Sequence, residues 1–170
     1  MTYYIVGNYV NKKTGREIQL ELYGVSSGIY QARIYAVREY ILHAYNDPKS
    51  EYYTRDIYLG IWNEKEHKYR YIFSVNEFLN DKQGEKYKTI IHLYLEEYKT
   101  ECLAQLSKDI LCKLAKEVEK AMYDDYLDLF QQPQQNDGSE EDNTNREIEY
   151  TPEIENIMED TVHKNMDRNI

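Results

Sequence analysis

The pattern of apolar and polar positions predicts two β-hairpins in the first half of the chain. β-forming residues fill 3–10, and apolar positions alternate with polar ones over 18–23, after a polar turn at 11–15 that contains a glycine. The same alternation returns over 56–61 and, beyond another polar turn, over 69–73. We expect these four segments to pair as one antiparallel sheet.

The alternation also assigns side chains to the two faces of the sheet. It places Leu22 and Tyr23 on opposite faces of the second strand. It places Tyr69, Tyr71 and Phe73 together on one face of the fourth strand.

A helical spacing of apolar residues follows each hairpin. After the first, Ser26 or Ser27 is expected to cap a helix that the Asn-Asp-Pro sequence at 46–48 ends. After the second, the S-x-x-E spacing at 74–77 predicts a capping box, and it starts a short helix that Gly84 should end. The apolar face of the first helix is Tyr30, Ile34, Val37, Ile41 and Ala44.

The segment from Glu85 to about Phe130 has apolar residues at spacings of three and four, which predicts helix. A single helix of that length is unusual, so we expect a bend or a break near 99–100. The apolar run within 85–95 is also compatible with a fifth strand, and helix is favoured because no breaker follows it.

Together these elements predict an α+β globular domain over 1–130, with a ββαββα-like antiparallel sheet covered by helices and a long C-terminal helical segment. Residues 3–45 and 54–83 resemble each other and suggest an internal hairpin–helix repeat, in which Gly7 and Gly60 correspond. Duplication and coincidence both explain a match over so few positions.

The last 40 residues differ from the rest in composition. Residues 131–150 are polar and acidic, which predicts a disordered linker. Residues 151–170 begin with Thr-Pro and predict a short amphipathic helix on that tether. Its apolar face either packs on its own domain or enters a groove on a partner or on a second copy, and it consists of Ile154, Ile157, Met158 and Val162.

Charge is unevenly distributed. The chain has 31 acidic and 21 basic residues, but 131–170 alone holds 11 acidic against 3 basic. The near-neutral remainder gives no reason to expect strong salt-dependent DNA binding, and it argues against a DNA mimic. No apolar run is long enough to span a membrane, so we expect a cytoplasmic protein in which Cys102 and Cys112 are reduced and partly buried.

Tyrosine dominates the aromatic residues, with 19 tyrosines against three phenylalanines and one tryptophan. Tyrosine suits partly solvated interfaces, because its ring is apolar and its hydroxyl needs water or another hydrogen-bond partner. We therefore predict a non-enzymatic protein–protein interaction module that regulates or inhibits a partner, by analogy with small inhibitors from phages and mobile elements. A homodimer is also compatible, and no cofactor is expected. The predicted partner-binding residues in the domain are Tyr9, Trp62, Tyr69 and Tyr71, beside the four apolar residues of the tail.

An enzymatic alternative comes from Asp56, followed by Glu66 and Lys68, with Glu39 on the preceding helix. This arrangement resembles the motif of PD-(D/E)xK nucleases, in which carboxylates hold Mg²⁺ and a lysine steadies the attacked phosphate. Arg55 stands where that family has proline. The resemblance implies a Mg²⁺-dependent nuclease in which Asp56 and Lys68 are exposed or nearly so.

Binding of single-stranded nucleic acid is a second alternative, which the sequence favours less than a protein partner. Tyrosines would stack on bases while basic turns follow the phosphates. No RNA-recognition signature is present, and the four histidines, at 43, 67, 92 and 163, lack metal-ligand spacing. The basic turn residues are Lys12, Lys13, Arg16, Lys65, Lys68 and Arg70.

Overall fold

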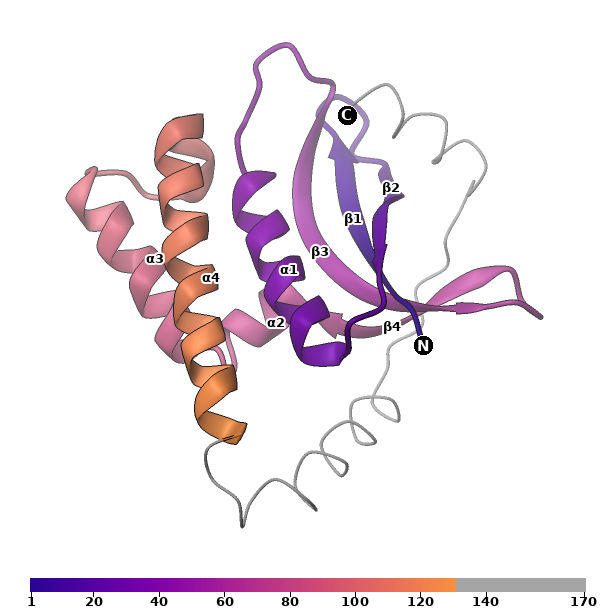
Figure 1. The fold of residues 1–170 in the computed structure, drawn as a ribbon. Coiled ribbons are helices and arrows are strands. Elements are labelled where there is room, and N and C mark those ends of the chain that lie inside the picture. The colour runs from indigo at the N-terminus through magenta and orange to yellow at the C-terminus, as the bar shows by residue number, and fades with distance from the viewer. Residues whose placement is uncertain (131–170) are drawn as a thin grey trace.

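The computed structural model describes residues 1–130, and it confirms the α+β class. The predictions for the linker 131–150 and the helix 151–170 lie outside the described residues. Figure 1 shows the helices gathered on one side of the sheet. The strands are β1 (Tyr3–Asn11), β2 (Glu17–Val25), β3 (Tyr52–Asn63) and β4 (Lys68–Ser74); the helices are α1 (Ile29–Leu42), α2 (Val75–Leu79), α3 (Glu85–Glu97) and α4 (Lys108–Phe130), with a 3-10 turn, η1 (Leu103–Gln105).

The two predicted hairpins join through their first strands. The strand order is β2-β1-β3-β4, and every neighbouring pair is antiparallel. At the centre, Tyr4 pairs with Gly60 and Asn8 pairs with Asp56. The predicted four-stranded antiparallel sheet is therefore confirmed.

Each hairpin has a β-bulge in its outer strand, which strict alternation did not predict. Val6 pairs with Glu21 while Ile5 pairs with Tyr23, so one extra residue lies in β2. The register of β4 shifts in the same way between its pairings with Gly60 and Leu59. An inserted residue lets two successive side chains face the same side of a sheet.

The bulges overturn two predicted face assignments. Leu22 and Tyr23 both contact the core beneath the helices, although alternation placed them on opposite faces. Phe73 contacts that same core, while Tyr69 and Tyr71 lie in a separate cluster with Val6. The two halves thus share a hairpin, a bulge in the outer strand and a following helix, and their origin by duplication stays a prediction.

The first helix differs from its predicted limits at both ends. Gly28 occupies the N-cap position with a φ of 106°, which favours glycine, and no side chain caps the helix. The predicted serine caps, Ser26 and Ser27, precede this glycine. The helix ends at Leu42, before the Asn-Asp-Pro sequence at 46–48.

The predicted serine cap of α2 is confirmed, but the role assigned to Gly84 was wrong. Ser74 caps α2, and its hydroxyl accepts a hydrogen bond from the backbone N–H of Glu77 at 3.2 Å. This helix ends at Leu79, and Gly84 is instead the N-cap of α3.

The remaining segment is two helices separated by a break, as predicted. Residues 85–95 belong to α3, which settles the choice between helix and strand. Lys99 has a φ of 53°, a left-handed conformation that helices do not continue through. Cys102 and Cys112 are free thiols, and both are exposed, so their predicted partial burial was wrong.

The main core lies between the sheet and α1 and α4. Ile5 and Leu59 of the sheet, Val37 of α1 and Leu114 and Val118 of α4 have no exposed surface. Each side chain of this kind stabilises the fold by roughly 1.5–3 kcal/mol through burial. Helices α1 and α4 pack side by side (Figure 1), and α3 packs against α4.

Candidate functional site

Three of the four domain residues predicted to bind a partner are buried, and the other four predicted residues lie in 151–170, outside the described residues. The exposed fraction is 9% for Tyr9, 2% for Tyr69 and zero for Tyr71, while Trp62 is half-buried. Side chains that are already enclosed cannot form a contact surface without rearrangement. Among the four, Trp62 alone keeps substantial accessible surface.

Tyr69 and Tyr71 belong to an outer-face cluster, on the side of the sheet away from the main core. The cluster consists of Val6 and the aromatic residues Tyr4, Tyr58, Trp62, Tyr69 and Tyr71. Ring centroids lie 5.0 Å apart for Trp62 and Tyr69 and 4.9 Å apart for Tyr58 and Tyr71. These separations are typical of packed aromatic pairs, so the rings cover one another.

The polar tips of Tyr9, Trp62 and Tyr69, three of the residues predicted to bind a partner, are occupied within the protein. The Tyr69 hydroxyl donates to Glu21, and the Trp62 indole N–H donates to Glu64 at 2.8 Å. The Tyr9 hydroxyl lies 3.3 Å from Nδ1 of His43. These contacts explain part of the tyrosine excess as sheet packing, and buried rings are poorly placed to stack on bases.

Asp56 is a buried structural residue, contrary to its expected exposure. Its exposed fraction is 5%, and its carboxylate accepts hydrogen bonds from the backbone N–H of Ile57 at 2.8 Å and of Asn76 at 3.0 Å. Its second oxygen accepts from the Ser74 hydroxyl at 2.5 Å. Asp56 therefore ties β3 to the start of α2.

The structure does not bring the four nuclease-like residues together. Lys68 pairs with Asn63 at the far end of the second hairpin, about 23 Å along β3 from Asp56 at 3.3 Å per residue. Lys68 lies 3.5 Å from Glu66 there. Glu39 lies on α1 in a different set of contacts. A shared metal site would need these carboxylates to converge.

Two further searches of residues 1–130 gave negative results. No cluster of three or more His, Cys, Asp or Glu side chains in this range is arranged to hold a metal ion. No helix in the same range combines the length and apolar character needed to cross a bilayer.

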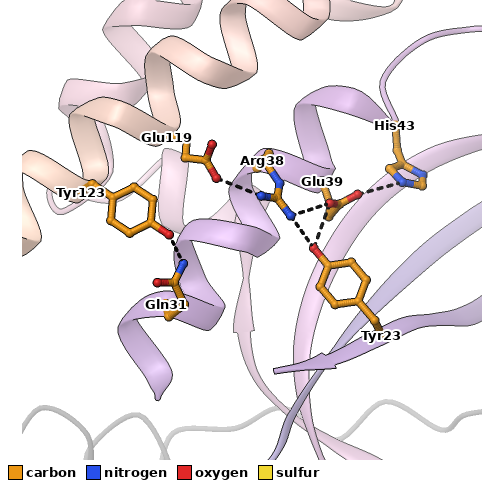
Figure 2. Close-up of polar contacts among 7 residues, drawn as sticks. All are labelled: Tyr23, Gln31, Arg38, Glu39, His43, Glu119 and Tyr123. Atoms are coloured by element: carbon orange, nitrogen blue, oxygen red, sulfur yellow. Dashed lines mark hydrogen bonds and ion pairs between the residues drawn. The ribbon is translucent and has the colours of Figure 1, made fainter. Parts of the chain in front are cut away.

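A polar network joins α1 to β2 and α4 (Figure 2). Arg38 donates to Glu119 of α4 at 3.0 Å and to the Tyr23 hydroxyl of β2 at 2.9 Å. Glu39 accepts from that hydroxyl at 2.9 Å, and its other oxygen lies 3.3 Å from Nε2 of His43. Each group is engaged with another member of the network, which indicates a structural role.

The network extends along α1 toward the end of α4. Gln31 donates to the Tyr123 hydroxyl, as Figure 2 also shows. The Arg38 guanidinium lies 4.4 Å from the centre of the Tyr35 ring, within the range of cation–π attraction. These contacts fix the position of α4 relative to α1.

The network also changes proton affinities. Burial alone would raise the pKa of Glu39, but hydrogen bonds from His43 and Tyr23 and the charge of Arg38 lower it below 4.5, its ordinary value. Burial and the neighbouring Glu39 raise the pKa of Tyr23. At neutral pH, therefore, Glu39 is ionised and Tyr23 is protonated.

We expect Glu39→Gln to lower the free energy of unfolding by about 1 kcal/mol at neutral pH, with a smaller effect in acid. Because the folded-state pKa of Glu39 is lowered, its contribution is present above the ordinary glutamate pKa and is lost as pH falls through the folded-state value. Urea unfolding of both proteins at about pH 7 and about pH 3.5 measures this. Glu101→Gln, at an exposed position, is the control. A difference that stays constant or grows in acid would contradict the assignment.

A pocket of about 210 Å³ lies among the four helices. Tyr30 of α1 and Tyr126 of α4 have ring centroids 5.2 Å apart, and Phe78 of α2 stacks on Tyr87 of α3 at 5.9 Å. Each of the four helices thus contributes one aromatic ring to the pocket wall. The other lining residues are Arg33, Ile34, Gln83, Met122, Asp125 and Leu129.

The two charged residues of the pocket are both held by neighbours. The Arg33 guanidinium lies 5.2 Å from the ring centre of Phe78 and donates to Gln83 at 3.2 Å. Asp125 accepts hydrogen bonds from the Tyr87 hydroxyl and from Lys86, the latter at 2.9 Å. Burial alone would raise the pKa of Asp125, but these two bonds lower it. The pocket therefore offers an apolar space between a fixed cation and a fixed anion.

The rim of the pocket leaves apolar surface exposed at the end of α4. Leu129, which lines the pocket, is 39% exposed. Phe78 and Met122, which also line it, are buried. An exposed apolar side chain at the rim of a pocket with aromatic walls is compatible with a site that receives an apolar group from another molecule.

The sequence pattern did not predict this pocket, because its walls come from four helices that are distant in the chain. The one local signal was the sequence Tyr-Leu-Asp-Leu at 126–129, in which apolar residues continue on exposed positions of the helix. Comparison of the chain with protein-family models, with characterised proteins and with solved structures found no match.

Proposed function

We propose that this protein is a non-enzymatic protein-binding module, and that the aromatic pocket receives an apolar side chain of its partner. The observation that carries the proposal is the pocket itself, with buried Phe78 and Tyr87 in its walls and exposed Leu129 at its rim. We propose further that binding regulates or inhibits the partner, in the manner of small inhibitors from phages or mobile elements.

The size of the pocket favours a side chain over a free-standing ligand. Drug-sized ligands and cofactors generally occupy about 300–1,000 Å³. The volume here is about 210 Å³, which suits one or two large side chains. Interfaces commonly draw most of their affinity from a few such anchors that fill pockets on the partner.

A selection experiment with the full chain tests this function. A displayed library of random peptides is selected on the wild-type protein, and the selected peptides are measured against Leu129→Lys. We expect peptides with a large apolar anchor and at least a tenfold weaker affinity for this variant, because a lysine places a charge at the apolar rim.

Leu93→Lys is the matched control, since Leu93 is an exposed leucine of α3, 59% accessible, that does not line the pocket. It should leave the affinity unchanged. If no selected peptide distinguishes Leu129→Lys from Leu93→Lys, the pocket is not the binding site and the proposed function fails.

A further inference from the structure

We propose that the occupant of the pocket is a basic amphipathic segment of a protein partner, with a large apolar anchor flanked by Lys or Arg. This inference rests on the proposed function and adds the chemistry of the partner. It is carried by the charge of α4 beside the pocket.

Three aspartates gather at this end of α4. Asp125 lines the pocket, while Asp124 and Asp128 are exposed. Asp124 and Asp128 are four residues apart, and each directly precedes a pocket-lining residue, Asp125 and Leu129 respectively. Residues four apart on a helix share a face, so two carboxylates run alongside the apolar wall.

One lysine faces all three of these aspartates. Lys86 is bonded to Asp125 and its pKa is raised, first by that bond and then by the charges of Asp125, Asp128 and Asp124. Arg33, the one cation among the pocket-lining residues, is already placed against aromatic rings and Gln83. The rim therefore keeps an excess of negative charge, which favours a cationic partner.

The same charge disfavours the chain's own C-terminal segment as the occupant. Residues 151–170 contain five acidic and two basic residues, so they would bring like charge to an acidic rim. The whole of 131–170 carries 11 acidic against 3 basic residues and follows directly on α4. This sequence adds to the attraction for a basic segment and lowers the affinity for an acidic one.

The pocket and the neighbouring carboxylates of Asp124 and Asp128 together specify the residue pattern of the partner segment. A helix with an apolar face and Lys or Arg on its flanks places its anchor in the pocket and its cations against Asp124 and Asp128. Contacts of this kind at a rim mainly affect association and salt dependence, while the anchor determines most of the affinity.

The test uses two synthetic amphipathic peptides that share one tryptophan anchor and differ in their flanks, lysine in one and glutamate in the other. Calorimetry with the full-length protein should show the lysine peptide binding about tenfold tighter, with the advantage shrinking as salt increases. Asp124→Asn together with Asp128→Asn should weaken the lysine peptide about fivefold. Glu96→Gln with Glu97→Gln, an exposed acidic pair at the other end of α3, should leave it unchanged.

Equal affinity for both peptides, or no effect of the aspartate changes, would overturn the inference. If Leu129→Lys still abolished binding of both peptides, the proposed function would stand without it. If Leu129→Lys affected neither peptide, the proposed function would fail as well.

Two other occupants are outcomes of the same experiment. Tighter binding of the lysine peptide by the full-length Ile157→Asp, Met158→Asp variant would show that the protein's own segment fills the pocket. A concentration-dependent dimer that Leu129→Lys abolishes would make a second copy the occupant. Either result would overturn the choice of a basic partner segment.

Discussion

Replacing Asp56 with alanine should lower the free energy of unfolding by about 4 kcal/mol, because several buried donors would lose their acceptor at once. Asp56 accepts from the backbone N–H groups of Ile57 and Asn76 and from the Ser74 hydroxyl. Ser74 in turn caps α2 through the Glu77 N–H. The loss therefore reaches both the sheet and the helix that follows it. Urea unfolding monitored by circular dichroism measures the change.

Asp56→Asn separates the hydrogen bonds from the charge. Both backbone N–H groups are bound by the same carboxylate oxygen, Oδ1, which an asparagine retains. The amide replaces only the oxygen that accepts from Ser74. We expect a loss of about 1–2 kcal/mol, close to that of one buried hydrogen bond.

Burial also raises the pKa of Asp56, with Ser74 and the two N–H groups acting against that rise. Because the folded-state pKa of Asp56 is raised, ionisation of this carboxyl group destabilises the folded state as pH rises from the ordinary aspartate pKa toward the folded-state value. The effect of pH on stability is therefore opposite in sign to that of Glu39. Replacing the carboxylate with a neutral amide removes this cost, so Asp56→Asn should be least harmful at neutral pH and above.

The control for these variants is Asp47→Ala. Asp47 also accepts a backbone N–H, that of Lys49 at 2.9 Å, but it is exposed, so water can replace it. If the free energy of unfolding of Asp56→Ala were within about 0.5 kcal/mol of the wild-type value, the structural role assigned to Asp56 would be wrong.

The local parts of the fold were predictable because each depends on residues that are close in sequence. Alternation over eight or fewer residues identified both hairpins, and the serine–glutamate spacing located the start of α2. The break between α3 and α4 followed from the length of the apolar pattern, and Lys99 shows where the helical backbone stops. Signals of this kind require no knowledge of tertiary contacts.

The bulges were not predictable in the same way. An extra residue at Leu22 or Ile72 leaves the apolar pattern almost unchanged, because the residue after each is an aromatic one that can also be buried. Only the pairing with β1 and β3 shows that Tyr23 and Phe73 turn toward the helices. The face of a strand is a property of its register, which the single strand does not encode.

The burial of the predicted site tyrosines was not predictable for a related reason. Tyrosine is compatible with both a partly solvated interface and a packed core, and composition alone does not show which of these environments a given tyrosine occupies. Tyr69 and Tyr71 are buried because Trp62 and Tyr58 pack against them from across the hairpin. The pocket depends on the packing of four helices, which helical spacing within each of them does not determine.

Gly84→Ala should destabilise the protein by about 3 kcal/mol or more, because a methyl group has no room there. A Cβ at this position would lie 2.0 Å from the carbonyl oxygen of Phe78 and 3.0 Å from the Cα of Leu79. Both are backbone atoms, so the clash is relieved only by moving α2 away from α3. The φ of −101° is open to any residue, so the requirement for glycine is close approach and not a left-handed backbone.

Gly24→Ala is the matched control. A Cβ there would meet the Thr2 methyl at 2.9 Å, the end of a side chain near the N-terminus that can turn away. We expect a cost of at most about 1 kcal/mol for this change, measured by urea unfolding beside Gly84→Ala. Because Phe78 and Tyr87 on either side of Gly84 also line the pocket, a partly folded Gly84→Ala should lose peptide binding together with stability. Equal and small costs for the two glycines would show that α2 and α3 separate easily, and the pocket between them would then be a mobile feature instead of a fixed one.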